Sequence, residues 1–172
     1  PYLESDKAFE VTTIHSIAGH TDTLLTQPPL RAPHPTSSYV SIIGGGSVPK
    51  PGEITLAHNG VLFLDELPEF ESKALESLRE PLEEGMVRIS RARGSEIFPA
   101  EFILVAAMNP CPCGYYGSKI KACVCKQSEI ERYQKRISGP IIDRIDMWTF
   151  VQHLPYEELA KEGVTGESEL VR

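Results

Sequence analysis

The amino-acid sequence predicts an α/β fold in which helices flank a parallel sheet. Two segments, Val61–Leu64 and Phe102–Ala107, consist of apolar residues alone. Runs of this kind are typical of strands that are buried on both faces, as in a parallel sheet covered by helices. The segment Glu69–Glu83 lies between them and carries apolar residues at helical spacing, so we expect a helix there. Pro81 should bend or end this helix, and Gly85 should close it.

Length and composition indicate one domain with its own core. The chain has 172 residues, 41% of them hydrophobic. No apolar run approaches the ~20 residues that span a bilayer, and the N-terminus lacks the basic and then apolar order of a signal peptide. We therefore expect a cytoplasmic protein without a membrane partner. The net charge of −7 argues against a generally basic nucleic-acid-binding surface, so any such binding must use a local cluster.

The N-terminal third predicts a helix, an extended segment and a glycine-rich loop. Ser5–Ala18 has a helical apolar face and is followed by Gly19 as a stop. The prolines of His20–Pro35 leave room only for a short edge strand. Ser37–Ile43 predicts a brief helix, and residues 44–52 predict a loop or a protruding hairpin. No Gly-Lys-Ser/Thr follows the glycines, so this loop is not a phosphate-binding P-loop.

A β-hairpin is predicted at Met86–Phe98, because two alternating segments flank a short turn there. Arg88, Arg91 and Arg93 make it the densest positive cluster of an acidic chain. A solvated hairpin kept soluble by its charge and a nucleic-acid contact are equally compatible with this pattern.

The C-terminal third predicts a helix, a short turn and a third strand. Ser128 and Glu131 form a capping-box pattern at the start of the helix. Residues 141–146 predict a turn or short helix that presents Arg144. Met147–Val151 is the predicted strand, and an acidic, turn-rich tail follows it.

Polar side chains follow both apolar strands. Asp65 and Glu66 come directly after the first, and Asn109 follows the second. In open α/β sheets, ligands collect at the carboxyl ends of the strands. A carboxylate pair there can hold Mg²⁺ and activate water, an amide can place that water, and an arginine can neutralise transition-state charge. The alternative is that Asp65 and Glu66 merely cap a helix that starts near Pro68.

The motifs, taken together, resemble the AAA+ ATPase module of the magnesium-chelatase-related (YifB/ComM) family. The matching runs lie within residues 44–70, 78–92, 98–110 and 138–146, and the resemblance covers roughly residues 5–160. It implies a three-layer P-loop NTPase-like core at residues 1–155, with an inserted hairpin at Met86–Phe98. The family's Gly-x-x-x-x-Gly-Lys-Ser/Thr is absent. The chain is therefore expected to be a fragment without the first strand, which carries Walker A, and without the lid, to which residues 156–172 would lead. The remaining sheet should then expose an edge or pair its outer strands directly.

The resemblance also implies roles for individual residues. Asp65 and Glu66 correspond to the Walker B pair, which binds Mg²⁺ and ATP, and Asn109 corresponds to the sensor-1 residue. Arg144 corresponds to an arginine finger that acts on the ATP of a neighbouring subunit in a ring, expected to be a hexamer. Arg136 is the second candidate for that finger.

The function implied by the resemblance is ATP hydrolysis coupled to DNA translocation or branch migration in the intact protein, with the fragment itself inactive. Pore-facing loops of such rings would bring Lys50, Arg88, Arg91 and Arg93 to DNA phosphates. One alternative is a magnesium-chelatase-type subunit that powers Mg²⁺ insertion into a porphyrin. Another is a non-catalytic zinc-binding interaction module.

Four cysteines form two Cys-x-Cys pairs nine residues apart, at Cys111, Cys113, Cys123 and Cys125. Without a secretory signal, this clustering favours a metal site or free thiols over a disulfide framework. Four thiolates suit tetrahedral Zn²⁺. Four reduced thiols in a surface loop are the alternative, and the sequence leaves both open.

Overall fold

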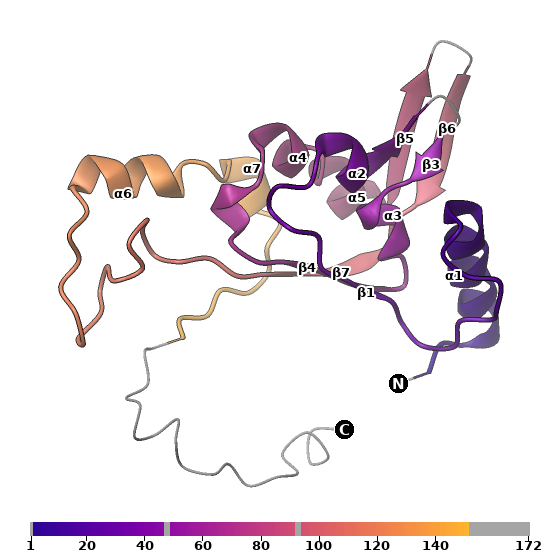
Figure 1. The fold of residues 1–172 in the computed structure, drawn as a ribbon, viewed down its shortest axis with the longest axis horizontal. Helices are drawn as coiled ribbons and strands as arrows, with labels where there is room; N and C mark the ends of the chain where they lie inside the picture. The colour runs from indigo at the N-terminus through magenta and orange to yellow at the C-terminus, as the bar shows by residue number, and fades with distance from the viewer. Residues whose placement is uncertain (1, 47–48, 92–93, 152–172) are drawn as a thin grey trace, which may run out of the picture.

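A central parallel sheet organises the molecule (Figure 1). The computed structural model describes residues 2–46, 49–91 and 94–151. The sheet has three strands in the order β1 (Leu30–Arg31), β4 (Gly60–Leu64) and β7 (Phe102–Ala106). Both strand pairs are parallel, and Gly60–Leu64 faces residues 102–106 residue by residue. The predicted α/β fold with a parallel sheet is therefore confirmed.

The helices that cover the sheet gather on one of its sides. Figure 1 shows α2 to α5 and α7 together there. The helices are α1 (Ser5–Ala18), α2 (Tyr39–Ile43), α3 (Glu53–Leu56), the 3-10 helix η1 (Leu67–Glu69), α4 (Ser72–Glu76), α5 (Arg79–Glu84), α6 (Gln127–Gln134) and α7 (Gly139–Ile142). None of the described helices combines the length and apolar character of a membrane-spanning segment.

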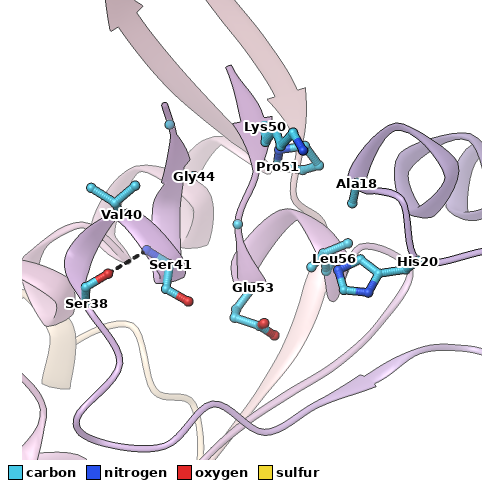
Figure 2. A pocket seen from close by; sticks show the side chains of 12 residues that line it. Ala18, His20, Ser38, Val40, Ser41, Gly44, Lys50, Pro51, Glu53 and Leu56 are labelled. Atoms are coloured by element: carbon cyan, nitrogen blue, oxygen red, sulfur yellow. Dashed lines mark hydrogen bonds between the residues drawn. The ribbon is translucent and has the colours of Figure 1, made fainter. Parts of the chain in front are cut away.

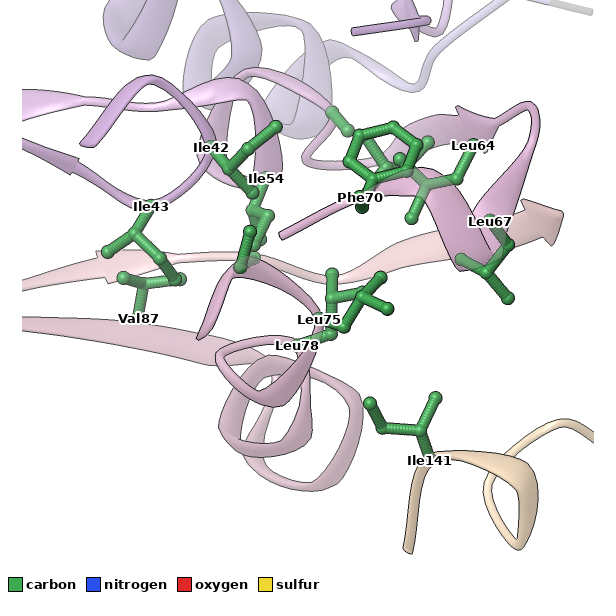
Figure 3. Close-up of a cluster of buried hydrophobic side chains, with 14 of the residues drawn as sticks. Ile42, Ile43, Ile54, Leu64, Leu67, Phe70, Leu75, Leu78, Val87 and Ile141 are labelled. Carbon is green, nitrogen blue, oxygen red and sulfur yellow. The ribbon is translucent and has the colours of Figure 1, made fainter. Parts of the chain in front are cut away.

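The hydrophobic core lies between these helices and one face of the sheet. Leu62 and Leu64 of β4 are 0% and 2% exposed and point into it. Figure 3 shows Leu64 close to Phe70, with Leu75 and Leu78 of the connecting segment in the same cluster. Burial of side chains of this size stabilises a fold by about 1.5–3 kcal/mol each. The alternation along β4 therefore fixes which face of the sheet is covered.

The other face of the sheet is open among the described residues. Ile103 and Val105 of β7 alternate with half-buried neighbours and are 66% and 44% exposed. β7 is also the last strand in the described sheet order, so its outer edge has no paired strand there. The structure thus exposes a sheet edge, the first of the two arrangements expected from the sequence.

The connecting segment Glu69–Glu83 is not one continuous helix, and this prediction was wrong. The structure divides it into η1, α4 and α5, with a break at Ser77–Leu78. The proline ring at position i clashes with the carbonyl of residue i−4 in a helix, and for Pro81 that residue is Ser77. Leu75 and Leu78, on the two sides of this break, are both buried in the core. Gly85 ends α5 in the left-handed conformation, as predicted.

Two antiparallel hairpins pack against each other beside the core. The first pairs β2 (Gly44–Gly45) with β3 (Lys50–Pro51), and the second pairs β5 (Met86–Arg91) with β6 (Gly94–Pro99). A Cβ added to Gly44 would lie 2.4 Å from the carbonyl oxygen of Lys50 and 2.9 Å from Cδ1 of Ile89, and the backbone there has φ +103°. Only glycine fits this close approach. The hairpin predicted at Met86–Phe98 is confirmed.

The strand predicted at Met147–Val151 does not form, and the segment pairs with none of the described strands. Its apolar side chains are exposed, Phe150 to 92%. An apolar run becomes a strand only where an adjacent strand accepts its backbone hydrogen bonds. No described strand lies in that position. The acidic tail predicted at 156–172 lies outside the described residues.

The helix α6 starts slightly earlier than the predicted capping box at Ser128 and Glu131. Its first residue is Gln127, and the backbone N–H of Lys126 donates to a carboxylate oxygen of Glu129 at 2.8 Å. The capping carboxylate is therefore Glu129, two residues before the one predicted.

Candidate active site

The carboxyl ends of the parallel strands β4 and β7 lie at the same edge of the sheet. Their pairing continues past the strand ends, because the N–H of Ala107 donates to the carbonyl of Leu64 at 2.9 Å. The N–H of Leu67 then donates back to the carbonyl of Ala107 at 3.0 Å. These two bonds clamp the Asp65–Glu66 turn beside the segment that leads to Asn109. The three polar residues that follow the strands thus lie at one edge.

The turn at Asp65 and Glu66 is held in an uncommon backbone conformation. Glu66 has φ 51° and ψ 45°, the left-handed region, which costs a residue with a Cβ roughly 1–2 kcal/mol. Oδ1 of Asp65 accepts the N–H of Glu66 at 2.8 Å. The buried Leu67 and Pro68 anchor the next two positions. Packing therefore compensates for the strain at the carboxylate pair.

Both carboxylates are exposed and open to a metal ion or water. Neither side chain caps η1, which starts at Leu67. The alternative that the pair merely caps a helix near Pro68 therefore does not describe this turn. Asn109 is also exposed, three residues after the end of β7.

Tyr133 of α6 is a neighbour of this edge that the sequence analysis missed. Burial raises the pKa of Tyr133, and the negative charges of Glu69 and Glu66 raise it further. A backbone hydrogen bond from Asn109 acts in the opposite direction. The Tyr133 hydroxyl therefore lies next to the Asn109 backbone and within electrostatic reach of Glu69 and Glu66. In the sequence, Tyr133 shows only as one residue on the apolar face of a helix.

The two candidate arginine fingers lie in different surroundings. Nη1 of Arg136 donates to Glu69 at 2.9 Å, next to the carboxylate turn. Arg144 forms an ion pair with Glu83 of α5 and donates to the carbonyl of Pro140. Among the described residues, no hydrogen bond or ion pair joins Arg144 to Asp65, Glu66 or Asn109. Arg136 thus lies close to the candidate site, whereas Arg144 is held against α5 by its ion pair with Glu83.

Comparison with known proteins shows the family of the chain. Residues 1–159 match the family model described as magnesium chelatase, subunit ChlI. The chain belongs to this family. The AAA+ character expected from the motifs follows from this membership, which supports an ATPase-type function.

Several relatives extend the comparison. The chain is 46% identical over 170 residues to "Uncharacterized protein YifB" of Escherichia coli, which covers 98% of the chain and 33% of the relative. It is 53% identical over 142 residues to "Competence protein ComM" of Haemophilus influenzae, and this match covers 83% of the chain and 28% of the relative. A "Magnesium-chelatase 67 kDa subunit" of Chlorobaculum parvum is 33% identical over 70 residues, and this match covers 41% of the chain and 11% of the relative. The chain spans about a third of the length of the YifB and ComM relatives.

Three of the four basic residues predicted to contact DNA, Lys50, Arg88 and Arg91, lie on the two adjacent hairpins. Lys50 is exposed on β3. Arg88 on β5 is engaged by Glu80 at 3.0 Å and Glu84 at 3.3 Å, and these hydrogen bonds raise its pKa. Arg91 is the last residue of β5, and Arg93 lies outside the described residues.

A separate open pocket of about 450 Å³ lies between α2, the β2–β3 hairpin and the end of α1 (Figure 2). Figure 2 shows Glu53 and Lys50 at its wall, with Ser38 hydrogen-bonded to the backbone of Ser41. The carboxylate of Glu53 is occupied by a two-bond ion pair with Arg31, at 2.7 and 2.8 Å. Of the predicted site residues, only Lys50 borders this pocket, so it is not the candidate active site.

The four cysteines converge in the loop between β7 and α6. Their sulfur atoms all lie within 4.8 Å of one another, and none forms a disulfide. Three of the separations are 3.4, 3.6 and 3.7 Å. Backbone N–H groups of Tyr115 and Val124 lower the pKa of Cys113 to about 6, whereas burial is the main cause that raises the pKa of Cys125 to about 12.

Proposed function

We propose that this chain carries hydrolytic residues of a ring-forming AAA+ ATPase. Asp65 would hold the Mg²⁺ of bound ATP, and Glu66 would orient or deprotonate the attacking water. The observation that carries this proposal is the parallel pairing of β4 and β7, which brings the carboxylate pair and the Asn109 segment to one sheet edge. Both carboxylates are exposed there, as a metal-binding pair must be.

Asn109 would help to place the attacking water, and Arg144 would act on ATP held by a neighbouring subunit. An arginine that acts across a subunit interface need not touch the carboxylates of its own chain, so the Glu83 contact of Arg144 is compatible with this role. Ring assembly would then have to exchange Glu83 for a phosphate. Arg136 remains the second candidate because it already lies beside Glu69.

The test is the substitution Glu66→Gln in the complete natural protein that contains this sequence. Loss of a catalytic base lowers the rate by about 10²–10⁴-fold, so steady-state ATP hydrolysis should fall by that factor while ATP binding persists. Glu71→Gln is the matched control, because Glu71 is also exposed and lies outside the turn. ATP hydrolysis unchanged by Glu66→Gln would refute the proposal. The loss of hydrolysis in both variants would refute the assignment to this turn.

The 172-residue chain alone should bind ATP negligibly, because it contains no Gly-Lys-Ser/Thr to grip the phosphates. Titration calorimetry with Mg²⁺ and ATP is the direct check. A dissociation constant in the micromolar range would contradict this expectation.

We further propose that the intact protein works in the cytoplasm as a hexamer and moves on DNA, in translocation or branch migration. The support is the pair of adjacent hairpins, which carry Lys50, Arg88 and Arg91, with Arg93 next in the sequence. Lys50 is exposed and available for phosphates, whereas Arg88 would have to leave Glu80 and Glu84.

DNA binding by the complete natural protein tests this part. Arg91→Gln with Arg93→Gln should weaken binding at low salt and reduce its salt dependence by about two counterions. Arg79→Gln is the control, since this exposed arginine lies on α5 rather than on a hairpin. ATP hydrolysis without any salt-dependent DNA binding would instead favour a chelatase-type subunit, a reading that the 67 kDa chelatase relative keeps open.

A further inference from the structure

We propose that Cys111, Cys113, Cys123 and Cys125 bind one structural Zn²⁺, and that this ion fixes the loop at residues 107–126 against α6 so that Asn109 is held in place. The zinc site stands on the cysteine geometry alone. The positioning of Asn109 as a working residue rests on the proposed ATPase function.

The sulfur geometry fits a tetrahedral site. With Zn–S bonds of about 2.3 Å, the four sulfurs of a regular tetrahedron lie about 3.8 Å apart. The Cys111, Cys113 and Cys123 sulfurs are 3.4–3.7 Å apart, and Cys125 completes a group that lies within 4.8 Å. A disulfide needs sulfurs about 2.05 Å apart, so this arrangement is that of four free thiols around one point.

Backbone N–H groups donate to at least two of the four sulfurs, and the nearby side-chain charge is positive. The N–H of Tyr116 donates to the sulfur of Cys111 at 3.3 Å, and Cys113 receives backbone N–H groups as well. Four thiolates around Zn²⁺ leave a net charge of −2. The segment 111–126 contains Lys119, Lys121 and Lys126 and no acidic residue, in a chain whose net charge is −7. The local charge is thus the one that would balance such a centre.

The loop needs a cross-link because it has little else to order it. Residues 107–126 contain no helix or strand, and connections longer than about 12–15 residues without such structure are uncommon in compact domains. Ile130 and Tyr133 of α6 are buried, yet they lie outside the main hydrophobic cluster. Cys113, Cys125 and Arg132 border one pocket, so the cysteine loop lies beside α6. An ion that joins the loop ends would offset the entropy of closing the loop.

The site also connects to the candidate active site. Cys111 follows Asn109 by two residues, and Nε2 of Gln134 donates to the carbonyl of Pro110 between them at 3.2 Å. Tyr133 contacts the Asn109 backbone. All four metal positions are filled by cysteine, which is the pattern of a structural rather than a catalytic zinc site. The cysteines are therefore positioning residues for Asn109.

The first experiment measures metal directly in the untagged 172-residue chain. Elemental analysis should give one zinc per chain, and X-ray absorption should give sulfur neighbours at about 2.3 Å. Cys111→Ser and the pair Cys113→Ser with Cys125→Ser should lower the zinc content severalfold, whereas Ser118→Ala in the same loop should leave it at one. A wild-type ratio near zero after growth with added zinc, or zinc retained when all four cysteines are serine, would overturn the proposal.

A second measurement uses the wild-type chain alone, so it does not depend on whether the cysteine variants fold. Zinc removal from the wild-type chain by a chelator should raise hydrogen exchange at residues 107–134, and added Zn²⁺ should restore protection. Exchange unaffected by chelation would overturn the structural role.

The link to Asn109 is tested in the complete natural protein. A misplacement of about 1 Å can cost ~100-fold in rate, so zinc depletion should lower kcat by up to that factor, and depletion should add little to Asn109→Ala. Zinc present but no effect of depletion on an active ATPase would overturn the positioning role alone. Zinc present in a protein without any ATPase would instead count against the proposed function and leave the metal site standing.

Discussion

The sheet edge and the cysteine loop are two neighbouring regions held in place by different means. The Asp65–Glu66 turn follows a strand whose Leu62 and Leu64 lie in the core, and backbone bonds to Ala107 continue the sheet beneath it. The cysteine loop has no strand, no helix and no contact with the main hydrophobic cluster apart from its ends. Burial orders the first region, and we propose that metal coordination orders the second.

This difference indicates how the two regions should respond to change. A site built on a packed sheet tolerates substitution at its exposed carboxylates, because its backbone is fixed elsewhere. A loop held by four thiolates opens when a single ligand or the ion is removed. The predictions that follow perturb one region at a time.

Metal removal should have the largest effect, and it should be confined to the loop. In the 172-residue chain, trypsin should cleave after Lys119 and Lys121 far faster with a chelator than with added Zn²⁺. Cleavage after Lys7 of α1 and Arg79 of α5 is the internal control and should stay slow in both conditions. Equal acceleration at all four sites would show that the two regions unfold together and that the comparison is wrong.

Leu62→Ala should destabilise the sheet region by about 2–5 kcal/mol, because it leaves a cavity at a fully buried position. Urea unfolding followed by circular dichroism measures the change. Ile103→Ala on the open face is the matched control and should cost less than about 1 kcal/mol. Zinc content should stay at one per folded chain in both variants. A comparable cost for the two substitutions would mean that the open face is covered in solution.

Acid should weaken the core through His15, which joins α1 to α3. Its Nε2–H donates to the carbonyl of Leu56 at 3.0 Å, and burial lowers its pKa from 6.5. In the unfolded chain, His15 takes up a proton at about pH 6.5, whereas in the folded chain its lowered pKa keeps it neutral at that pH. The stabilisation that neutral His15 gives to the folded chain is therefore complete above about pH 6.5 and is lost as the pH falls below that value.

His15→Gln should flatten the dependence of unfolding free energy on pH between about 5 and 7. His20→Gln, at an exposed position, should preserve it. If the slope of unfolding free energy against pH were unchanged in His15→Gln, His15 would not be the cause of the pH dependence.

The Glu69–Arg136 ion pair joins the two regions and should have the smallest effect. Both side chains are nearly half exposed, and exposed pairs contribute about 0–1 kcal/mol. Glu69→Gln should therefore shift the urea midpoint only slightly, by less in high salt than in low. A loss above about 2 kcal/mol would indicate that α6 is tied to the sheet through this contact, contrary to our account.

The sequence predicted the elements whose pattern is local. The helix Ser5–Ala18, the strands around Leu62 and Ile103 and the hairpin after Gly85 all follow from periodicity and from glycine at the right place. Each of these elements shows in its own stretch of sequence, although the two strands pair with each other across about 40 residues.

The failures share a physical cause, because each depends on residues distant in the sequence or on steric detail. Met147–Val151 has a strand's composition but lacks a paired strand among the described residues. Pro81 divides the helix through the carbonyl of Ser77, four residues earlier. The position of Tyr133 beside Asn109 depends on the path of the cysteine loop, which no periodicity reports. The grouping of the four cysteines could be predicted, because paired spacing is itself a local signal.

The central claim is that Glu66 and Asn109 act on the same bound nucleotide from one sheet edge. A double-mutant cycle of ATP hydrolysis in the complete natural protein tests it most directly, with Glu66→Gln, Asn109→Ala and the double variant compared. Residues that act as one unit are strongly non-additive, so we predict that the double variant is barely slower than Glu66→Gln alone. Independent, multiplying effects, or no effect of either substitution, would contradict the account.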